Sequence, residues 1–332
     1  MTRTSLPIVM LGAVLLVGLA PCQEVFAEDV KSPQKATNEP LCKRLDEALK
    51  GKPVLAEVRL EVVGTSSNGL KSLVLFGNGV GIWDGRRQFK VESEAVRGLL
   101  QLIEQAGFCT WPDRASQIGR ENREEMDPDA MQIYRAISIT IGGASKTVTQ
   151  IARSPESAAF TALVTRLLDA CEKDGQRGIS AGNLQDGLAK LSDGTLAPQV
   201  LQVTLNCPQQ TATDPEGWLL RLSGAEVEVQ RNTKMAGYTD RRRMRLPDQE
   251  IRDLAKMLFS ADLSALPGNI VAAGYTDLRV GVLNQTKGIQ ARMFAGMSPT
   301  TRPEAQAAFA KVRGALYALY QRVAREGTPS NG

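Results

Sequence analysis

A short run of arginines is the most concentrated chemical feature of this sequence. Guanidinium groups stay charged and bind carboxylates or phosphates through paired hydrogen bonds. From Lys173 onward, 20 basic residues stand against 15 acidic ones. This asymmetry favours an acidic partner, an anionic membrane surface or a polyanionic glycan, while the alternative is a charged strand edge that discourages sheet pairing. The candidate contact residues are Arg241, Arg242, Arg243 and Arg245.

The chain contains no histidine. Histidine is the side chain most often used for proton transfer near neutral pH, the usual base of serine and cysteine hydrolases, and the commonest ligand of catalytic zinc. We therefore expect no catalytic, cofactor-binding or metal-binding residues. The open alternative is a hydrolase of the cell envelope that uses carboxylates, because paired Asp and Glu side chains need no histidine.

Gly178-Ile179-Ser180-Ala181-Gly182 matches the G-x-S-x-G string of α/β-hydrolases. In that motif a strand-to-helix turn directs the serine toward a histidine base. Here no apolar strand precedes the string and no histidine exists, so the segment is interpreted as part of a linker.

Four cysteines follow the first 27 residues, at positions 42, 109, 171 and 207. They lack C-x-x-C spacing, which disfavours a zinc or redox site, and four cysteines allow three disulfide connectivities. We favour a Cys42–Cys171 disulfide, because both residues lie at the edges of the first predicted unit. The alternative is that some of the four are buried free thiols.

The first 27 residues have the three parts of a cleavable secretory signal. Arg3 supplies the positive start, Leu6 to Ala20 forms an apolar run too short to span a bilayer, and small or compact residues end at Ala27. The mature chain is then expected to begin at Glu28 and to be periplasmic or extracellular, and soluble. No later segment is long and apolar enough to cross a membrane.

A lipoprotein anchored through Cys22 is the alternative, although Pro21 stands where lipoproteins carry a small residue. Export permits disulfides and argues against a nucleic-acid partner, as does the lack of aromatic residues among the arginines. The oligomeric state is left open.

Hydrophobic periodicity predicts a first repeat over residues 39–172, after a flexible leader at 28–38. A helix is expected at 39–50, because Leu41, Leu45 and Leu49 recur at four-residue spacing. Alternating apolar residues then predict three strands, a helix that stops near Gly107, two further strands and a closing helix. The expected strands lie at 58–62, 73–83, 88–91, 134–141 and 147–151.

The same order recurs over residues 199–326. Val203 and Leu205 match the first strand, Trp218–Leu222 the second, and Phe309 repeats Phe160 of the closing helix. The predicted fold class is therefore α+β: a tandem duplication of a β-β-β-α-β-β-α unit, with mostly antiparallel sheet and helices on one face. A glycine-rich linker is expected at 173–198, with a short helix near Leu184 to Leu191, and a disordered tail at 327–332.

This order of elements resembles small bacterial α+β domains of the emfourin type, which inhibit thermolysin-like proteases. The resemblance lies in Leu75 to Gly85, Leu99 to Pro112 and Tyr134 to Val148, with their counterparts in the second repeat. It is one of pattern, without a shared diagnostic motif, and it implies protein binding and protease inhibition. No functional residue is carried over from the family.

Together these observations predict an exported, non-enzymatic binding protein whose partner is another protein or an acidic envelope component. A structural component of the envelope is the remaining alternative. We expect the arginine segment to provide the contact surface and the protein to need no cofactor.

Overall fold

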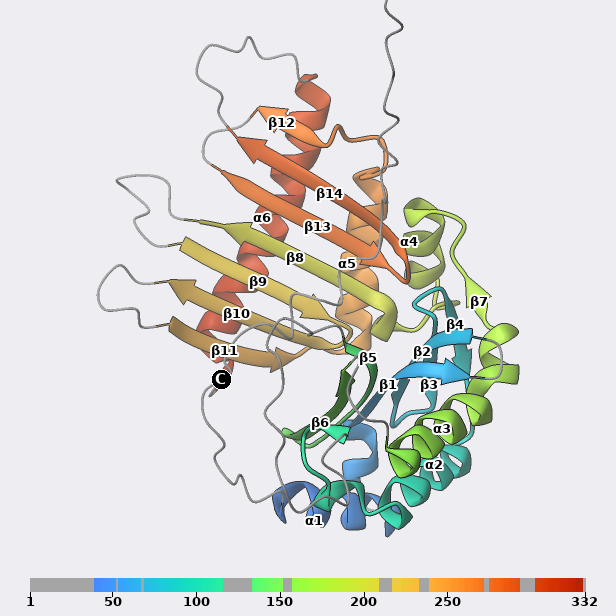
Figure 1. Ribbon diagram of the computed structural model, residues 1–332. Coiled ribbons are helices and arrows are strands. Elements are labelled where there is room, and N and C mark those ends of the chain that lie inside the picture. Colours follow the sequence, from blue (N-terminus) through green and yellow to red (C-terminus); the bar gives the residue numbers. More distant parts are fainter. Residues whose placement is uncertain are drawn as a thin grey trace, which may run out of the picture. The chain divides into compact units, whose positions relative to one another are not determined.

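The computed structural model (Figure 1) describes residues 39–51, 53–66, 69–115, 133–151, 157–208, 217–232, 239–271, 275–292 and 302–330. The predicted signal, its cleavage site and the leader lie outside the described residues. The described residues belong to a unit that spans Asn38–Gly332 and holds two hydrophobic cores, one on each of two sheets. The fold is α+β with mostly antiparallel sheets, as predicted.

The first sheet has the strand order β6-β5-β1-β2-β3-β4-β7, and all its neighbouring strands pair antiparallel. Alternate residues of each strand face the core, which is why apolar residues recur at every second position. The strands are β1 (Val58–Ser66), β2 (Gly69–Phe76), β3 (Val80–Trp83), β4 (Arg87–Lys90), β5 (Ile133–Ile141), β6 (Ala144–Ile151) and β7 (Ile179–Ser180).

Helices cover the apolar face of this sheet. They are α1 (Glu39–Leu49), α2 (Ser93–Gln105) and α3 (Ala158–Gln176), with 3-10 turns η1 (Pro53–Glu57) and η2 (Phe108–Thr110). The predicted helix at 39–50 is thus confirmed, and it buries Leu41 and Leu45. The Ser157 side chain accepts a hydrogen bond from the Phe160 amide and caps α3.

The second sheet has the order β12-β14-β13-β8-β9-β10-β11-β15, in which only the β12–β14 pair is parallel among the described strands. The strands are β8 (Leu201–Cys207), β9 (Gly217–Ser223), β10 (Glu226–Asn232), β11 (Thr239–Arg245), β12 (Asn269–Val271), β13 (Thr276–Val282), β14 (Gln285–Arg292) and β15 (Thr328–Pro329). Helices α5 (Asp248–Ser260) and α6 (Pro303–Glu326) lie on one face of this sheet (Figure 1).

Each sheet has one more strand before its first helix than the sequence predicted. The expected single strand at 73–83 is two strands, β2 and β3, separated by a turn in which Gly79 has a φ of +82°. Apolar alternation continues across that turn, so periodicity alone read it as one strand. In the second sheet the extra strand is β10, which follows β9 after a turn at Gly224 with a φ of +63°.

The segment predicted as a linker is folded against both sheets. α3 continues to Gln176, β7 pairs with β4, and α4 (Leu184–Ser192), followed by the 3-10 turn η5 (Pro198–Val200), packs against α5. The predicted helix near Leu184 to Leu191 is confirmed. The Ala197 amide also donates to Gln88 Oε1 at 2.5 Å, which fixes the end of the segment to β4.

The predicted disordered tail is wrong for its described part. Thr328 and Pro329 form β15, which pairs antiparallel with Arg243 and Arg242 of β11. The sequence gave no sign of this strand because two residues are too few to show an alternating pattern.

Hydrogen-bond registers coincide between the two sheets at places far from the predicted repeat elements. A two-residue strand follows the last helix of each half, and a short parallel segment pairs with the edge strand after the first helix. The matching register pairs are Arg87 with Ser180 and Arg242 with Pro329, and Arg114 with Thr149 and Asn269 with Gln290.

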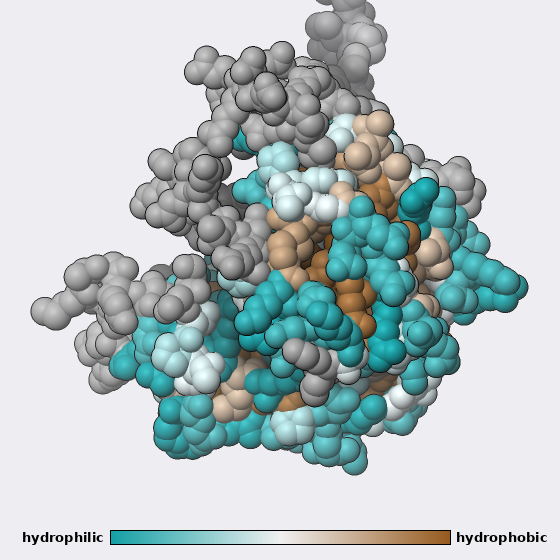
Figure 2. Space-filling view, turned by 90° about the horizontal axis from the view of Figure 1, so that it is seen from below, coloured by the Kyte–Doolittle hydropathy of each residue, from teal (hydrophilic) through white to brown (hydrophobic). Residues whose placement is uncertain are grey.

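Charged residues make up 23% of the sequence, and hydrophilic side chains cover most of the face in Figure 2, where apolar residues gather in a central band. Within the described part of the chain, no helix is both long enough and apolar enough to cross a membrane.

Candidate functional site

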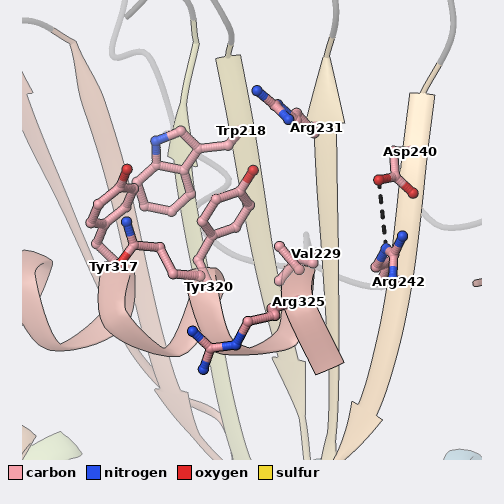
Figure 3. A pocket seen from close by; sticks show the side chains of 10 residues that line it. Trp218, Val229, Arg231, Asp240, Arg242, Tyr317, Tyr320 and Arg325 are labelled. Carbon is pink, nitrogen blue, oxygen red and sulfur yellow. Dashed lines mark ion pairs between the residues drawn. The ribbon is translucent and has the colours of Figure 1, made fainter. Parts of the chain in front are cut away.

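A pocket of about 540 Å³ lies between α6 and the strands β9, β10 and β11 (Figure 3). Its size falls within the range of small-molecule sites, and it combines aromatic side chains with charged ones. The lining residues are Trp218, Val229, Arg231, Asp240, Arg242, Tyr317, Tyr320, Gln321, Ala324 and Arg325.

Strand pairing places the sheet side of the pocket. Arg231 of β10 pairs with both Trp218 of β9 and Asp240 of β11, and the next inward row pairs Val229 with Arg242. Residues two apart on a strand point to the same face, so all five side chains face α6.

The helix side comes from one stripe of α6. Tyr317, Tyr320, Gln321 and Ala324 are separated by three or four residues, which puts them on one face of the helix.

Three aromatic rings form one wall of the pocket. The Trp218 and Tyr320 ring centroids are 4.6 Å apart, and the Tyr317 and Tyr320 rings stack at 5.9 Å with an interplanar angle of 15°. Trp218 and Tyr320 are buried, whereas Tyr317 keeps 39% of its surface exposed. The buried pair therefore forms a fixed floor, and Tyr317 offers a ring to a bound group.

The charged lining residues are three arginines and one aspartate. Arg242 Nε lies 3.6 Å from Asp240 Oδ2, and Arg242 Nη1 donates to the Gly327 carbonyl at 3.4 Å. Arg325 forms an ion pair with Glu326 at 2.7 Å. With more guanidinium groups than carboxylates in its lining, the pocket favours an anionic group.

The predicted contact surface is divided between the two faces of the sheet. Of its four arginines, only Arg242 lines the pocket. Side-chain alternation puts Arg241, Arg243 and Arg245 on the face away from α6. There Arg243 Nε forms a 2.6 Å ion pair with Glu228 of the neighbouring strand. The structure therefore brings one predicted residue into the site and leaves the other three outside it.

Sequence analysis missed the aromatic wall. Trp218 was assigned to a core strand, and the two tyrosines of the last helix were not considered. A usable signal was present, because two of the five tyrosines in the chain stand three residues apart in α6. Only the strand register brings them together with Trp218.

The matching place in the first half is filled by an indole. Trp83 pairs with Leu73 as Val229 pairs with Leu220, and Gly175 follows Phe160 in α3 at the spacing by which Ala324 follows Phe309 in α6. A Cβ atom on Gly175 would lie 2.6 Å from atoms of the Trp83 ring, so the indole rests on the helix backbone.

All four cysteines described are free thiols, so the predicted Cys42–Cys171 disulfide is not formed. Cys171 is buried in α3, and burial raises its pKa to about 12. The residue that lies beside Cys42 is Cys109, whose side chain is hydrogen-bonded to it. The edges of a unit in sequence are not its neighbours in space.

The G-x-S-x-G string has a structural role. Its first glycine leaves no room for a side chain, because a Cβ atom on Gly178 would lie 2.6 Å from the Gln88 carbonyl oxygen. Ser180 lies in β7, and the Gly182 amide donates to Asp186 Oδ2 at the start of α4. No group of three acidic or cysteine residues that could hold a metal occurs in the described ranges.

No protein-family model and no curated protein sequence matches this chain. The argument for a function therefore rests on the pocket and its surroundings.

Proposed function

We propose that this chain is an exported, non-enzymatic binding protein whose second half holds a carboxylate-bearing saccharide in the pocket of α6 and β9–β11. The observation that carries the proposal is the pairing of an exposed tyrosine ring, on a buried Trp218–Tyr320 floor, with three guanidinium groups. A sugar ring presents C–H groups to an aromatic face, and its carboxylate accepts paired hydrogen bonds from arginine.

A binding role fits the lining better than hydrolysis does. Asp240 is the only carboxylate among the lining residues, and its oxygen lies 3.6 Å from Arg242. Glycoside hydrolysis by carboxylates needs two such groups on either side of the scissile bond. The pocket thus supports the proposed binding function.

We further propose that the two halves are copies of one ancestral unit. The coincident registers of the β4–β7 and β11–β15 pairs support this, because chance would not reproduce a two-residue strand at the same offset from the last helix. On this proposal, Trp83 fills the site in one copy and Val229 leaves it open in the other. Protease inhibition, which the resemblance to emfourin-type domains implies, stays a prediction.

The test is calorimetric titration with oligomers of galacturonic acid, with their methyl esters as a control that keeps the ring and removes the charge. The key variant is the double substitution Val229→Trp and Ala324→Gly, which reproduces in the second half the filled arrangement of Trp83 on Gly175. We expect measurable binding of the acid form by the unchanged protein and at least a tenfold loss in the filled variant.

A matched pair of arginines separates the pocket from general surface charge. Arg242→Gln changes the pocket, whereas Arg245→Gln changes the opposite face of the same strand. Binding should weaken about tenfold, or roughly 1.4 kcal/mol, in the first variant only. Equal weakening in both variants, or full binding by the filled variant, would refute the pocket as the site.

A further inference from the structure

We infer that Cys42 and Cys109 form a disulfide that fastens α1 to the rest of the first half. The inference is independent of the pocket and rests on the predicted export, since disulfides persist in oxidising compartments. It replaces the predicted Cys42–Cys171 pairing.

The two cysteines come from elements that already pack together. Cys42 lies on α1, whose Leu41, Leu45 and Ala48 are buried in the first core, and Cys109 lies in η2, directly after α2. Both thiols are half-buried, and a thiol–thiol hydrogen bond joins them. Because the sulfur atoms are already adjacent, closing the bond requires side-chain rotation rather than movement of either element.

A buried lysine provides a second, independent observation at this place. Lys146 has 4% of its surface exposed, and within the part of the chain that the structure describes its Nζ atom has no hydrogen-bond partner. Asp113 Oδ1 lies 3.9 Å away but belongs to a side chain that is 86% exposed, so its attraction is weak. A buried ammonium group without a partner is costly, yet this one acts electrostatically on Cys109 and favours its thiolate.

The environment of Cys109 decides when the bond can form. Burial, with the hydrogen bond from Cys42, raises the pKa of Cys109 to about 12 and outweighs Lys146. The thiolate is the reactive species, so the fully folded dithiol reacts slowly at neutral pH. The bond therefore forms while the chain folds, before α1 covers η2.

The oxidant is a disulfide, such as oxidised glutathione or a thiol–disulfide oxidoreductase. One cysteine thiolate attacks the oxidant and releases one thiol as a mixed disulfide forms. The second cysteine attacks the mixed disulfide, closes the Cys42–Cys109 bond and releases the second thiol. Two cysteine thiols are oxidised, the oxidant is reduced to two thiols, and the two cysteine protons are taken up by them.

The other two cysteines should remain thiols, because each is buried in a different core. Cys171 packs inside the first, and Cys207 belongs to the second, where its Sγ atom lies 3.6 Å from Thr276 Oγ1.

The test maps thiols on the full chain, both as recovered from the cells that export it and after refolding with reduced and oxidised glutathione. The protein is unfolded without reductant, alkylated with iodoacetamide and digested for mass spectrometry. We expect a peptide that joins Cys42 to Cys109, with Cys171 and Cys207 alkylated. Alkylation of both Cys42 and Cys109 after oxidative refolding, or a peptide joining Cys42 to Cys171, would overturn the inference.

Two variants guard against a failure to fold. Cys171→Ser should keep the cross-linked peptide, and Cys42→Ser should leave Cys109 alkylated. Reductant should lower the midpoint of thermal unfolding of the unchanged protein by about 5–10 °C. The same reductant should leave the midpoint of the Cys42→Ser variant unchanged, and an equal shift in that variant would count against the bond.

Discussion

The indole of Trp83 lies directly on Gly175 of α3. A Cβ atom built on that glycine would stand 2.6 Å from two atoms of the ring, closer than side chains approach one another in folded proteins. At the matching positions of the second half, Val229 and Ala324 line an open pocket instead. A large residue against a small one on the helix thus fills the first half, and two residues of middle size leave space in the second.

We predict that Gly175→Ala destabilises the protein by about 1–3 kcal/mol, because the rigid indole has to move to admit a methyl group. The measurement is the free energy of unfolding in urea. The matched control is Gly314→Ala in α6, where an added Cβ atom meets nothing within 4 Å. That variant should gain about 0.5–1 kcal/mol from helix propensity. A similar effect from both substitutions would show that Trp83 does not constrain α3.

Lys146→Met should raise the free energy of unfolding by about 1–3 kcal/mol, because it removes a buried ammonium group without a hydrogen-bond partner among the described residues and keeps the packed stem. Urea unfolding of the reduced protein measures this. Asp113→Asn serves as the control and should change little, since the carboxylate is exposed. A loss of stability in Lys146→Met would mean that the ammonium group has a strong partner.

Strand alternation was enough to predict the fold class and most elements, because each strand buries one face and solvates the other. It failed where structure depends on few residues: β7 and β15 have two residues each and no period. It also joined β2 to β3, because a turn does not interrupt the apolar pattern.

The site was harder to predict for a different physical reason. The arginines were visible as a run, but alternation divides them between the two faces, and only Arg242 reaches the pocket. The pocket also depends on residues distant in sequence, since Trp218 meets Tyr317 and Tyr320 only through packing of α6 on β9.

Trp218 and Tyr317 should differ in what their removal costs. Trp218 is 5% exposed, so Trp218→Ala should lower the free energy of unfolding by about 3–5 kcal/mol. Tyr317 is 39% exposed, so Tyr317→Ala should cost only about 1 kcal/mol while weakening the binding of galacturonate oligomers. Urea unfolding and calorimetric titration of the same samples check both expectations. Full binding by Tyr317→Ala would remove its ring from the proposed contact.

Asp186 at the start of α4 should make stability depend on pH in acid. The carboxylate accepts hydrogen bonds from Lys190 Nζ and from the Gly182 amide, both at 2.8 Å, and these hold its pKa below the ordinary value of 3.8. A lowered pKa in the folded state means that the group stabilises the fold above pH 3.8, and that this contribution disappears as the pH falls through the lowered pKa. We therefore expect Asp186→Asn to lower the thermal midpoint at pH 7 and the difference from the unchanged protein to vanish in strong acid. Lys190→Gln keeps the amide hydrogen bond and should show a smaller shift at pH 7. A difference between Asp186→Asn and the unchanged protein that persists at low pH would mean that the asparagine disturbs α4 sterically, and that the charge of Asp186 is not the cause.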